Sequence, residues 1–335
     1  MATQTWQHGG FVDFSRGRFE TGGENLYVNA KGEIETIHRT GLLNNGRVDI
    51  VLPNSHGYIE RGPTWIYKPA MGVCAAACRD GLTPARSEGE DWPRRELPND
   101  SGWMSRVVDL DGDGCNDLVV VNGENGVTSE LDSYVYWGGP EGLTEERAAL
   151  PTIGAYDVAV VDVDGDGRLD LVFPSAWRDH HSAGVPLLLK VYRQSRPREF
   201  EDASEQFNLI GVGAVSVACA DLNHNGKPDL VVANYRSHFE YDTDSFVYWG
   251  TGCGFDSQQP MRLPTHYATQ VLTADLNGDG FDEIIFSGGH QVWIYWNDAG
   301  RFSCARRTII EVEGNSSMFA LGAVRMRSMS LSTRS

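Results

Sequence analysis

The chain has 335 residues, with 46 acidic against 28 basic side chains and a formal net charge of -18 at pH 7. This charge argues against nucleic acids and anionic membrane surfaces as partners. No apolar run approaches the roughly 18 residues that a membrane-spanning helix needs, and the polar stretch 1–10 has no signal-peptide pattern. A hydrophobic content of 41% with 38 glycines suits many short strands and turns.

One loop pattern recurs along the chain: Asp, any, Asp or Asn, any, Asp or Asn, Gly, any, any, Asp or Glu. A degenerate copy at 41–49 comes first and lacks carboxylates at positions 1 and 3. Four complete copies follow at 109–117, 162–170, 221–229 and 275–283, and their first residues are 53, 59 and 54 positions apart. Oxygen ligands at positions 1, 3, 5 and 9 fold around one hard cation, and the Gly permits the sharp turn.

The sequence therefore predicts about four calcium ions, with little or no binding at 41–49. The predicted ligands are Asp109, Asp111, Asp113, Asp117, Asp162, Asp164, Asp166, Asp170, Asp221, Asn223, Asn225, Asp229, Asp275, Asn277, Asp279 and Glu283. The site at 221–229 has only two acids and is expected to bind most weakly. We expect these ions to stabilise the fold and not to act in catalysis.

The flanks of these loops indicate strands and not the helices of an EF-hand. An EF-hand needs a bidentate Glu at loop position 12, where this chain has Val120, Phe173, Val232 or Phe286. Runs rich in Val precede and follow the loops, as at 106–108 and 118–121. Such runs are typical of buried strands, so each loop is predicted to join two of them.

A second phrase follows the acidic hairpins: Tyr136-Trp137, Tyr248-Trp249 and Tyr295-Trp296, with weaker copies at Tyr27, Tyr67 and Tyr192. Each repeat of about 55 residues thus predicts four antiparallel strands, which is the size of a propeller blade. The recurring tryptophans are predicted to pack between blades. Trp103 and Trp177 lie outside the phrase and are candidates for stacking on a ligand.

These repeats resemble the FG-GAP/VCBS repeat β-propellers, which are related to the head of integrin α subunits. The resemblance rests on the four acidic loops and on the hydrophobic pairs at 118–119, 171–172, 230–231 and 284–285. It implies an all-β, single-domain propeller of six four-stranded blades, or seven if the chain is a fragment. The expected blades are 1–40, 41–100, 101–150, 151–210, 211–262 and 263–315.

The C-terminal segment 316–330 is expected to complete the first blade, because 322–330 aligns with the strand at 213–221. A strand from the far end of the chain would close the ring and leave no open sheet edge. Residues 330–335 stand where a sixth acidic loop is expected, with every acid replaced. Two interpretations stay open: a closing strand that needs no metal, and a chain whose natural sequence continues differently.

A ligand is expected on the face opposite the calcium loops, where the second strand of each blade connects to the third. Five of the nine histidines fall in these connections, together with Arg61, Arg178, Arg236 and Tyr235. The predicted set is His56, Arg178, His180, His181, Arg236, His238 and His290. These residue types suit an anionic or hydroxyl-rich ligand such as an acidic sugar.

Three classes of function stay open. The first is a non-catalytic extracellular or cell-surface scaffold for binding or adhesion, with a glycan or a protein as its ligand. The second is a polysaccharide lyase or hydrolase, in which His and Arg supply a base and neutralise a carboxylate. No Gly-x-Ser-x-Gly, His-Glu-x-x-His or phosphate loop demands an enzyme. The third is a structural module of a longer secreted protein.

Overall fold

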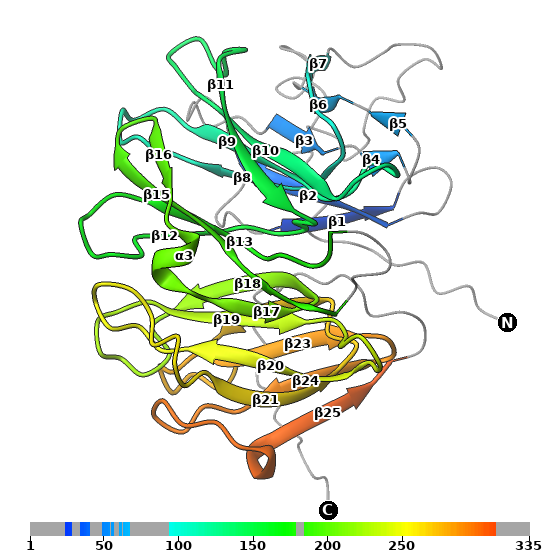
Figure 1. Ribbon diagram of the computed structural model, residues 1–335, viewed down its shortest axis with the longest axis vertical. Coiled ribbons are helices and arrows are strands. Elements are labelled where there is room, and N and C mark those ends of the chain that lie inside the picture. The colour runs from blue at the N-terminus through cyan, green and yellow to red at the C-terminus, as the bar shows by residue number, and fades with distance from the viewer. Residues whose placement is uncertain are drawn as a thin grey trace, which may run out of the picture.

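The computed structural model describes residues 24–28, 34–40, 49–53, 55–56, 60–61, 63–67, 94–178 and 184–312 (Figure 1). Within them the fold is all-β, as predicted, because the only helical pieces are α3 (Ser204–Phe207) and the short η1 (Cys304–Arg306). None of the helices in this part of the chain has the length and apolar character that membrane spanning requires.

Four antiparallel sheets of four strands each follow one another along the chain, and within each sheet the strands pair in chain order. The first of these four consists of β8 (Gly102–Val108), β9 (Asp117–Asn122), β10 (Glu130–Tyr136) and β11 (Arg147–Ile153), and the second of β12 (Ala159–Val161), β13 (Asp170–Phe173), β15 (Lys190–Arg196) and β16 (Glu199–Asp202). The third consists of β18 (Ala214–Ala220), β19 (Asp229–Asn234), β20 (Asp242–Tyr248) and β21 (Met261–His266). The fourth consists of β22 (Gln270–Ala274), β23 (Glu283–Gly288), β24 (Gln291–Tyr295) and β25 (Arg307–Glu311). A small two-stranded sheet joins β14 (Pro186–Leu188) to β17 (Ile210–Val212).

The first sheet differs from the pattern that the sequence predicts. Its order is β1 (Glu24–Val28), β2 (Ile34–Thr40), β3 (Asp49–Leu52), β6 (Thr64–Tyr67) and β7 (Arg94–Leu97), with a hairpin of β4 (Ser55–His56) and β5 (Glu60–Arg61) beside it. The sequence places Tyr27 in a blade of its own, whereas the structure pairs its strand with β2. The predicted closing segment 316–330 lies outside the described residues. The number of blades therefore stays a prediction.

Successive sheets pack face to face through apolar side chains. The second strands β9, β13, β19 and β23 are buried along their whole length. For β9, β13 and β19, the side chains of the two faces belong to two different apolar clusters, each shared with a neighbouring sheet. One apolar cluster, for example, joins Val121 and Trp137 of one sheet to Phe173 of the next. The first strands of three sheets also adjoin, since β18 contacts both β12 and β22, and β8 contacts β2, the second strand of the first sheet.

The repeated Tyr of the third strand ties its sheet to the stretch of chain that directly precedes that sheet. Tyr192 donates its hydroxyl hydrogen to the carbonyl oxygen of Pro151 at 2.6 Å, and Tyr248 donates to that of Ile210 at 2.6 Å. Tyr136 and Tyr295 make the equivalent bonds to the carbonyl oxygens of Pro98 and Pro264. A side chain that the sequence marks as part of a strand is thus also an inter-sheet tether.

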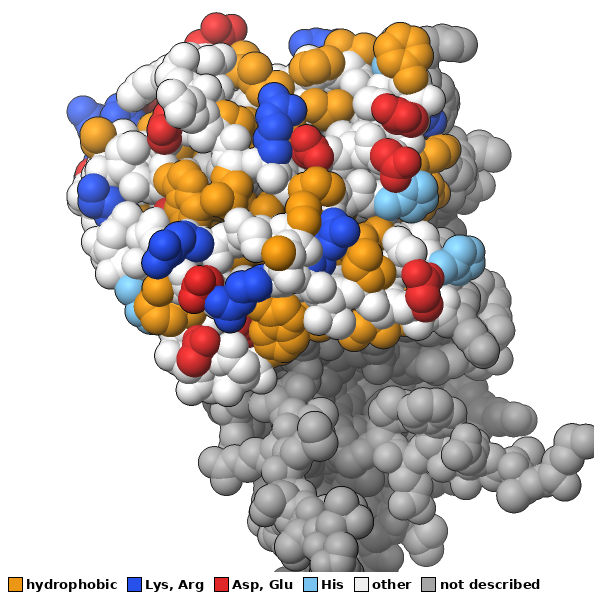
Figure 2. All heavy atoms as spheres, turned by 90° about the horizontal axis from the view of Figure 1, so that it is seen from below, with side chains coloured by type: hydrophobic (Ala, Val, Ile, Leu, Met, Phe, Trp, Pro, Cys, Tyr) orange, Lys and Arg blue, Asp and Glu red, His pale blue; other side chains and the backbone are white. Residues whose placement is uncertain are grey.

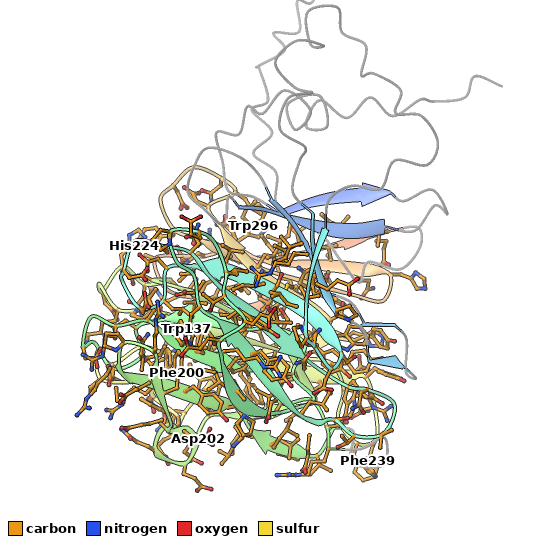
Figure 3. All side chains as sticks on the ribbon, turned by 90° about the horizontal axis from the view of Figure 1, so that it is seen from above. Trp137, Phe200, Asp202, His224, Phe239 and Trp296 are labelled. Atoms are coloured by element: carbon orange, nitrogen blue, oxygen red, sulfur yellow. The ribbon has the colours of Figure 1, made fainter. Side chains whose placement is uncertain are left out.

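The predicted role of the recurring tryptophans is confirmed for two of them. The ring of Trp137 stacks on Phe200 of the next sheet with 6.1 Å between centroids (Figure 3). Trp249 stacks on Phe302 in the same way at 6.5 Å. Trp296, by contrast, donates its indole N–H to Thr308 of its own sheet at 2.8 Å.

A buried carboxylate, Asp157, links four sheets where their first strands adjoin. Only 4% of Asp157 is exposed. It accepts hydrogen bonds from the Arg106 guanidinium at 3.1 Å and from the Ser216 hydroxyl at 2.7 Å. The Ser216 oxygen in turn accepts from the backbone N–H of Val271 at 3.2 Å. Burial raises the pKa of Asp157 and the Arg106 charge opposes this, so the carboxylate depends on its partners.

We expect Asp157→Ala to lower the free energy of unfolding by about 3–5 kcal/mol, because it leaves a partly buried arginine and a buried hydroxyl without their acceptor. Chemical denaturation measures this. The matched control is Asp298→Ala, which removes a half-exposed ion pair to Arg306 and should cost less than about 1 kcal/mol. Equal losses in the two variants would contradict the linking role of Asp157.

Candidate functional site

Each of the four acidic loops connects the first strand of a sheet to the second, as predicted. The loop at 109–117, for example, runs from the end of β8 to the start of β9. Gly112 and Gly114 in it have φ values of 76° and 85°, in the left-handed region that glycine adopts without strain. The arrangement is a tight hairpin and not a helix–loop–helix. We call the end of the sheets that carries these loops the acidic end.

The carboxylate at position 1 of each loop holds the turn in shape. Asp109 accepts the backbone N–H of Gly114 at 3.0 Å, five residues later. Asp162, Asp221 and Asp275 accept the equivalent glycine N–H at 2.8, 2.8 and 3.0 Å. Such local side-chain bonds to the backbone stabilise a loop against other conformations, so the loop shape is encoded within nine residues.

The acid at position 9 is fully buried and fastens the loop to the third strand. Asp117 accepts the N–H of Leu110 within the loop at 2.9 Å and the N–H of Gly138, just beyond β10, at 2.7 Å. Asp170 and Asp229 repeat both bonds, and Glu283 repeats the one within its loop. The sequence assigns this position only as a metal ligand. The structure adds a second role, which we call the clamp: the buried carboxylate holds the loop against the end of the third strand. The recurrence of an acid there, even where positions 3 and 5 become Asn, is the signal that indicates this second role.

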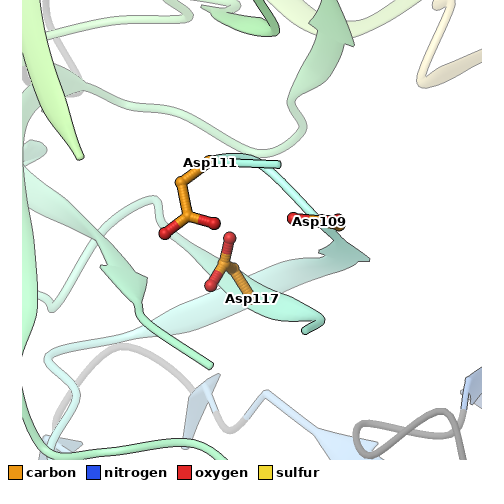
Figure 4. A group of neighbouring side chains, drawn as sticks. All are labelled: Asp109, Asp111 and Asp117. Atoms are coloured by element: carbon orange, nitrogen blue, oxygen red, sulfur yellow. The ribbon is translucent and has the colours of Figure 1, made fainter. Parts of the chain in front are cut away.

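Two loops bring three carboxylates close enough to share one cation. One oxygen each from Asp109, Asp111 and Asp117 lies within 4.8 Å of the others (Figure 4), and Asp162, Asp164 and Asp166 form the same kind of group. Hard carboxylate oxygens at this spacing fit calcium.

The remaining predicted ligands are placed as follows. Asp113 and Asp170 stand outside these groups, and the loops at 221–229 and 275–283 form no such group of three acids among the described residues. In these two loops the side-chain oxygens of Asn223, Asn225, Asn277 and Asp279 accept backbone N–H groups of their own loop.

Basic side chains of the protein itself offset part of the charge at the acidic end. Arg198, in the turn between β15 and β16, reaches the loop of the preceding sheet and pairs with Asp111 and Asp113. Arg193 lies 3.2 Å from a carboxylate oxygen of Asp164. Burial raises the pKa of Asp170 to about 6, with the nearby acids adding to this. A bound cation would oppose that shift by favouring the charged form.

The two roles within one loop predict different responses to substitution. In excess chelator, Asp117→Asn should cost about 1–3 kcal/mol of unfolding free energy, because the amide group faces one of two buried N–H donors. Asp113→Asn should change stability by less than about 0.5 kcal/mol in chelator but weaken calcium binding. Asn225 already shows that an Asn at this position keeps the local bond, to Lys227, at 2.9 Å. If Asp117→Asn and Asp113→Asn lost equal unfolding free energy without calcium, the clamp role of Asp117 would be contradicted.

At the opposite end of the sheets, a cavity of about 780 Å³ lies between the sheet β18–β21 and the sheet β22–β25. It is lined by Tyr241, Asp242, His266, Tyr267, Gly289, His290, Gln291 and Glu311. The ring centroids of Tyr241 and Tyr267 are 4.8 Å apart. His266 Nδ1 lies 2.7 Å from a carboxylate oxygen of Asp242, and Gln291 donates to Glu311 at 2.6 Å.

Of the predicted ligand residues, His290 is the one that lines this cavity. Arg236 lies over the Tyr241 ring, at 5.1 Å from its centroid, and bonds to carbonyl oxygens of its own loop. His238 is exposed and its ring rests against Phe239, while Arg178 pairs with the exposed Glu130. His56 lies in β4, where only the backbone is described, and His180 and His181 are outside the described residues.

The sequence analysis missed the aromatic and acidic residues that line the cavity. Tyr241, His266 and Tyr267 flank the strands β20 and β21, and His266-Tyr267 directly follows the phrase Leu263-Pro-Thr. An aromatic pair where one sheet connects to the next was the available signal.

Residues 109–173 match the family model described as the FG-GAP-like repeat. The chain carries an FG-GAP-like repeat. The matched residues include two complete acidic loops, the strands β9, β10 and β11, and the hairpin of β12 and β13. The resemblance that the loops indicate is confirmed for these residues.

Among solved structures, similar chains include an Agrocybe aegerita lectin described for specific recognition of non-reducing terminal N-acetylglucosamine, with a TM-score of 0.44, 16% identity, and coverage of 88% of this chain and 66% of that one. BBS1N in complex with ARL6DN has a TM-score of 0.38 and 16% identity, and the match covers 64% of this chain and 58% of that one. The V. cholerae biofilm matrix protein Bap1 has a TM-score of 0.40 and 14% identity, and the match covers 83% of this chain and 39% of that one. The chain thus spans less than two thirds of the length of each. Among curated proteins, no sequence matches it.

Proposed function

We propose that the chain is a non-catalytic binding scaffold that holds a neutral, hydroxyl-rich glycan in the cavity between the sheets β18–β21 and β22–β25. The observation that carries this proposal is the placement of Tyr241 and Tyr267 beside His290, Gln291 and acidic side chains in one cavity. A sugar presents apolar C–H faces to aromatic rings and hydroxyl groups to polar side chains. Binding pockets with these features combine apolar walls with a few converging polar groups.

The charge of the cavity favours a neutral sugar over the acidic sugar that the sequence indicates. Asp242 and Glu311 both line the cavity, and two carboxylates repel an anionic ligand. On the face seen in Figure 2, acidic and basic side chains are interspersed among apolar ones, and the described residues there form no large basic patch.

The same proposal includes a β-propeller as the frame. Its support is the succession of four-stranded sheets whose first strands adjoin. Six blades follow if 316–330 completes the ring, and seven if the natural chain is longer. Calcium in the acidic loops would hold this frame together. Extracellular modules commonly bind calcium in the range of 10⁻⁴–10⁻³ M, so we propose a location outside the cell or at its surface.

Removing calcium should lower the melting temperature. Each occupied site stabilises the fold by about 2.7 kcal/mol at a hundredfold excess of calcium over its Kd. Titration with a chelator, followed by calorimetry, should show release first from 221–229, where Asn replaces two acids. Restoring calcium should restore the melting temperature. An unchanged melting temperature after full chelation would show that the loops do not stabilise the fold.

Glycan-array screening followed by titration calorimetry tests the binding site. Tyr241→Ala and His290→Ala should each weaken binding of the best neutral glycan by about tenfold or more, without lowering the melting temperature. Trp296→Ala is the matched control, because this aromatic side chain lies outside the cavity lining and should leave affinity unchanged. Binding that survives both cavity variants would contradict this site.

A second candidate function rests on the Asp242–His266 pair, because a carboxylate that orients a histidine is the arrangement of a general base. A polysaccharide lyase or hydrolase could use such a pair. The His266 side chain is 50% exposed and that of Asp242 is 78% exposed, and solvent screening at such exposure weakens their electrostatic coupling. The test is product formation from polysaccharides by the intact protein. Cleavage that is lost in His266→Ala would favour the enzyme.

A further inference from the structure

We infer that the binding surface continues from the cavity as a row of aromatic side chains across three sheets, so that the ligand is an extended neutral oligosaccharide and not a single terminal sugar. This inference rests on the proposed function and specifies the size of its ligand. The aromatic row consists of Tyr241, Tyr267, Tyr235, Trp177, Tyr156 and Trp103.

The rings of the aromatic row form an unbroken series of neighbours. From Tyr241 to Tyr267 the centroids are 4.8 Å apart, and from Tyr267 to Tyr235 they are 4.4 Å apart. The next steps are 6.2 Å to Trp177, 5.3 Å to Tyr156 and 4.8 Å to Trp103. Because Tyr241 and Tyr267 also line the cavity, the row begins inside the proposed sugar site.

All members of the row lie at the end of the sheets opposite the acidic loops. Trp103 is near the start of β8, Tyr156 is in the connection from β11 to β12, and Trp177 follows β13. Tyr235 follows β19. Figure 3 places His224 of an acidic loop and Phe239 of the β19–β20 connection at opposite ends of the sheets. The row therefore crosses three sheets on the end that carries the cavity.

Both ends of the row are open to solvent, and a hydrogen-bond acceptor lies along it. Trp103 is 41% exposed and Tyr241 is 39% exposed. Between them, the Glu124 carboxylate is only 6% exposed and accepts from the Tyr156 hydroxyl and the Trp177 indole N–H, each at 3.3 Å. The Glu124 carboxylate thus fixes the Tyr156 and Trp177 rings in place, and its charge disfavours an anionic ligand beside them.

The orientation of Trp103 is built into the neighbouring loop. A Cβ atom at Gly123 would lie 2.6 Å from the indole Cδ1 of Trp103 and 2.9 Å from the backbone carbonyl oxygen of Ala155, which precedes Tyr156 of the row. The indole thus packs directly against the loop backbone, and a larger residue there would displace it. Gly123→Ala is accordingly a second way to disturb the far end of the row without removing a ring.

Titration calorimetry on the full chain in calcium, with chito-, cello- and manno-oligosaccharides of one to about six units, tests this inference. In the series that binds best, affinity should rise about tenfold or more from the monosaccharide to the longest chain. Trp103→Ala and Gly123→Ala should remove most of that gain and leave monosaccharide affinity unchanged, because Trp103 lies at the end far from the cavity. Tyr241→Ala should weaken both, and Trp296→Ala neither.

The outcomes separate this inference from the proposed function. If the longest chain binds no more tightly than the monosaccharide, or if both Trp103→Ala and Gly123→Ala leave its affinity unchanged, the extended site is wrong while the cavity stands. If the two variants lower the melting temperature and all affinities together, the row serves packing and the extended site is again wrong. If no series binds, both are overturned.

Discussion

The buried carboxylate at the ninth position of each acidic loop is the interaction on which the rest of the structure depends. Asp117, Asp170 and Asp229 each join a loop to the third strand of their sheet through two backbone N–H groups. These bonds fix the loop beside the strand whose Tyr reaches the preceding sheet. A single side chain thereby couples the shape of a nine-residue loop to the packing between sheets. Without an acceptor, its buried donors would each carry a desolvation cost.

This coupling divides the molecule into two ends with different chemistry. The acidic end carries groups that suit a hard cation, and basic residues such as Arg198 reach into it from the neighbouring sheet. The opposite end carries aromatic rings, histidines and a cavity. Between them, apolar second strands and the Asp157 network hold the sheets together. Connections at the cavity end are therefore free to differ between sheets, and binding sites commonly arise on such loops.

In the proposed function, calcium and the glycan would bind at opposite ends of the sheets and affect different properties of the protein. Calcium would stabilise the frame, and its loss would affect every sheet that has an acidic loop. The glycan would contact side chains that contribute little to packing.

The sequence by itself determined the acidic loops, the strands around them and the repeated Tyr and Trp phrase, because the interactions that set these features are local. Position 1 bonds to position 6 of the same loop, and a run such as 118–121 needs burial wherever it lies. The cavity could not be predicted in this way. Tyr241 and His266 become neighbours through the pairing of β20 with β21, and only the packing of a second sheet brings His290 to them. The direction in which a side chain at a loop tip points could not be predicted either. The Ser237 N–H donates to the Glu240 carbonyl oxygen at 2.8 Å, and the turn that this bond closes leaves His238 exposed. The tertiary structure decided the site because its geometry belongs to the contact between sheets and not to any one repeat.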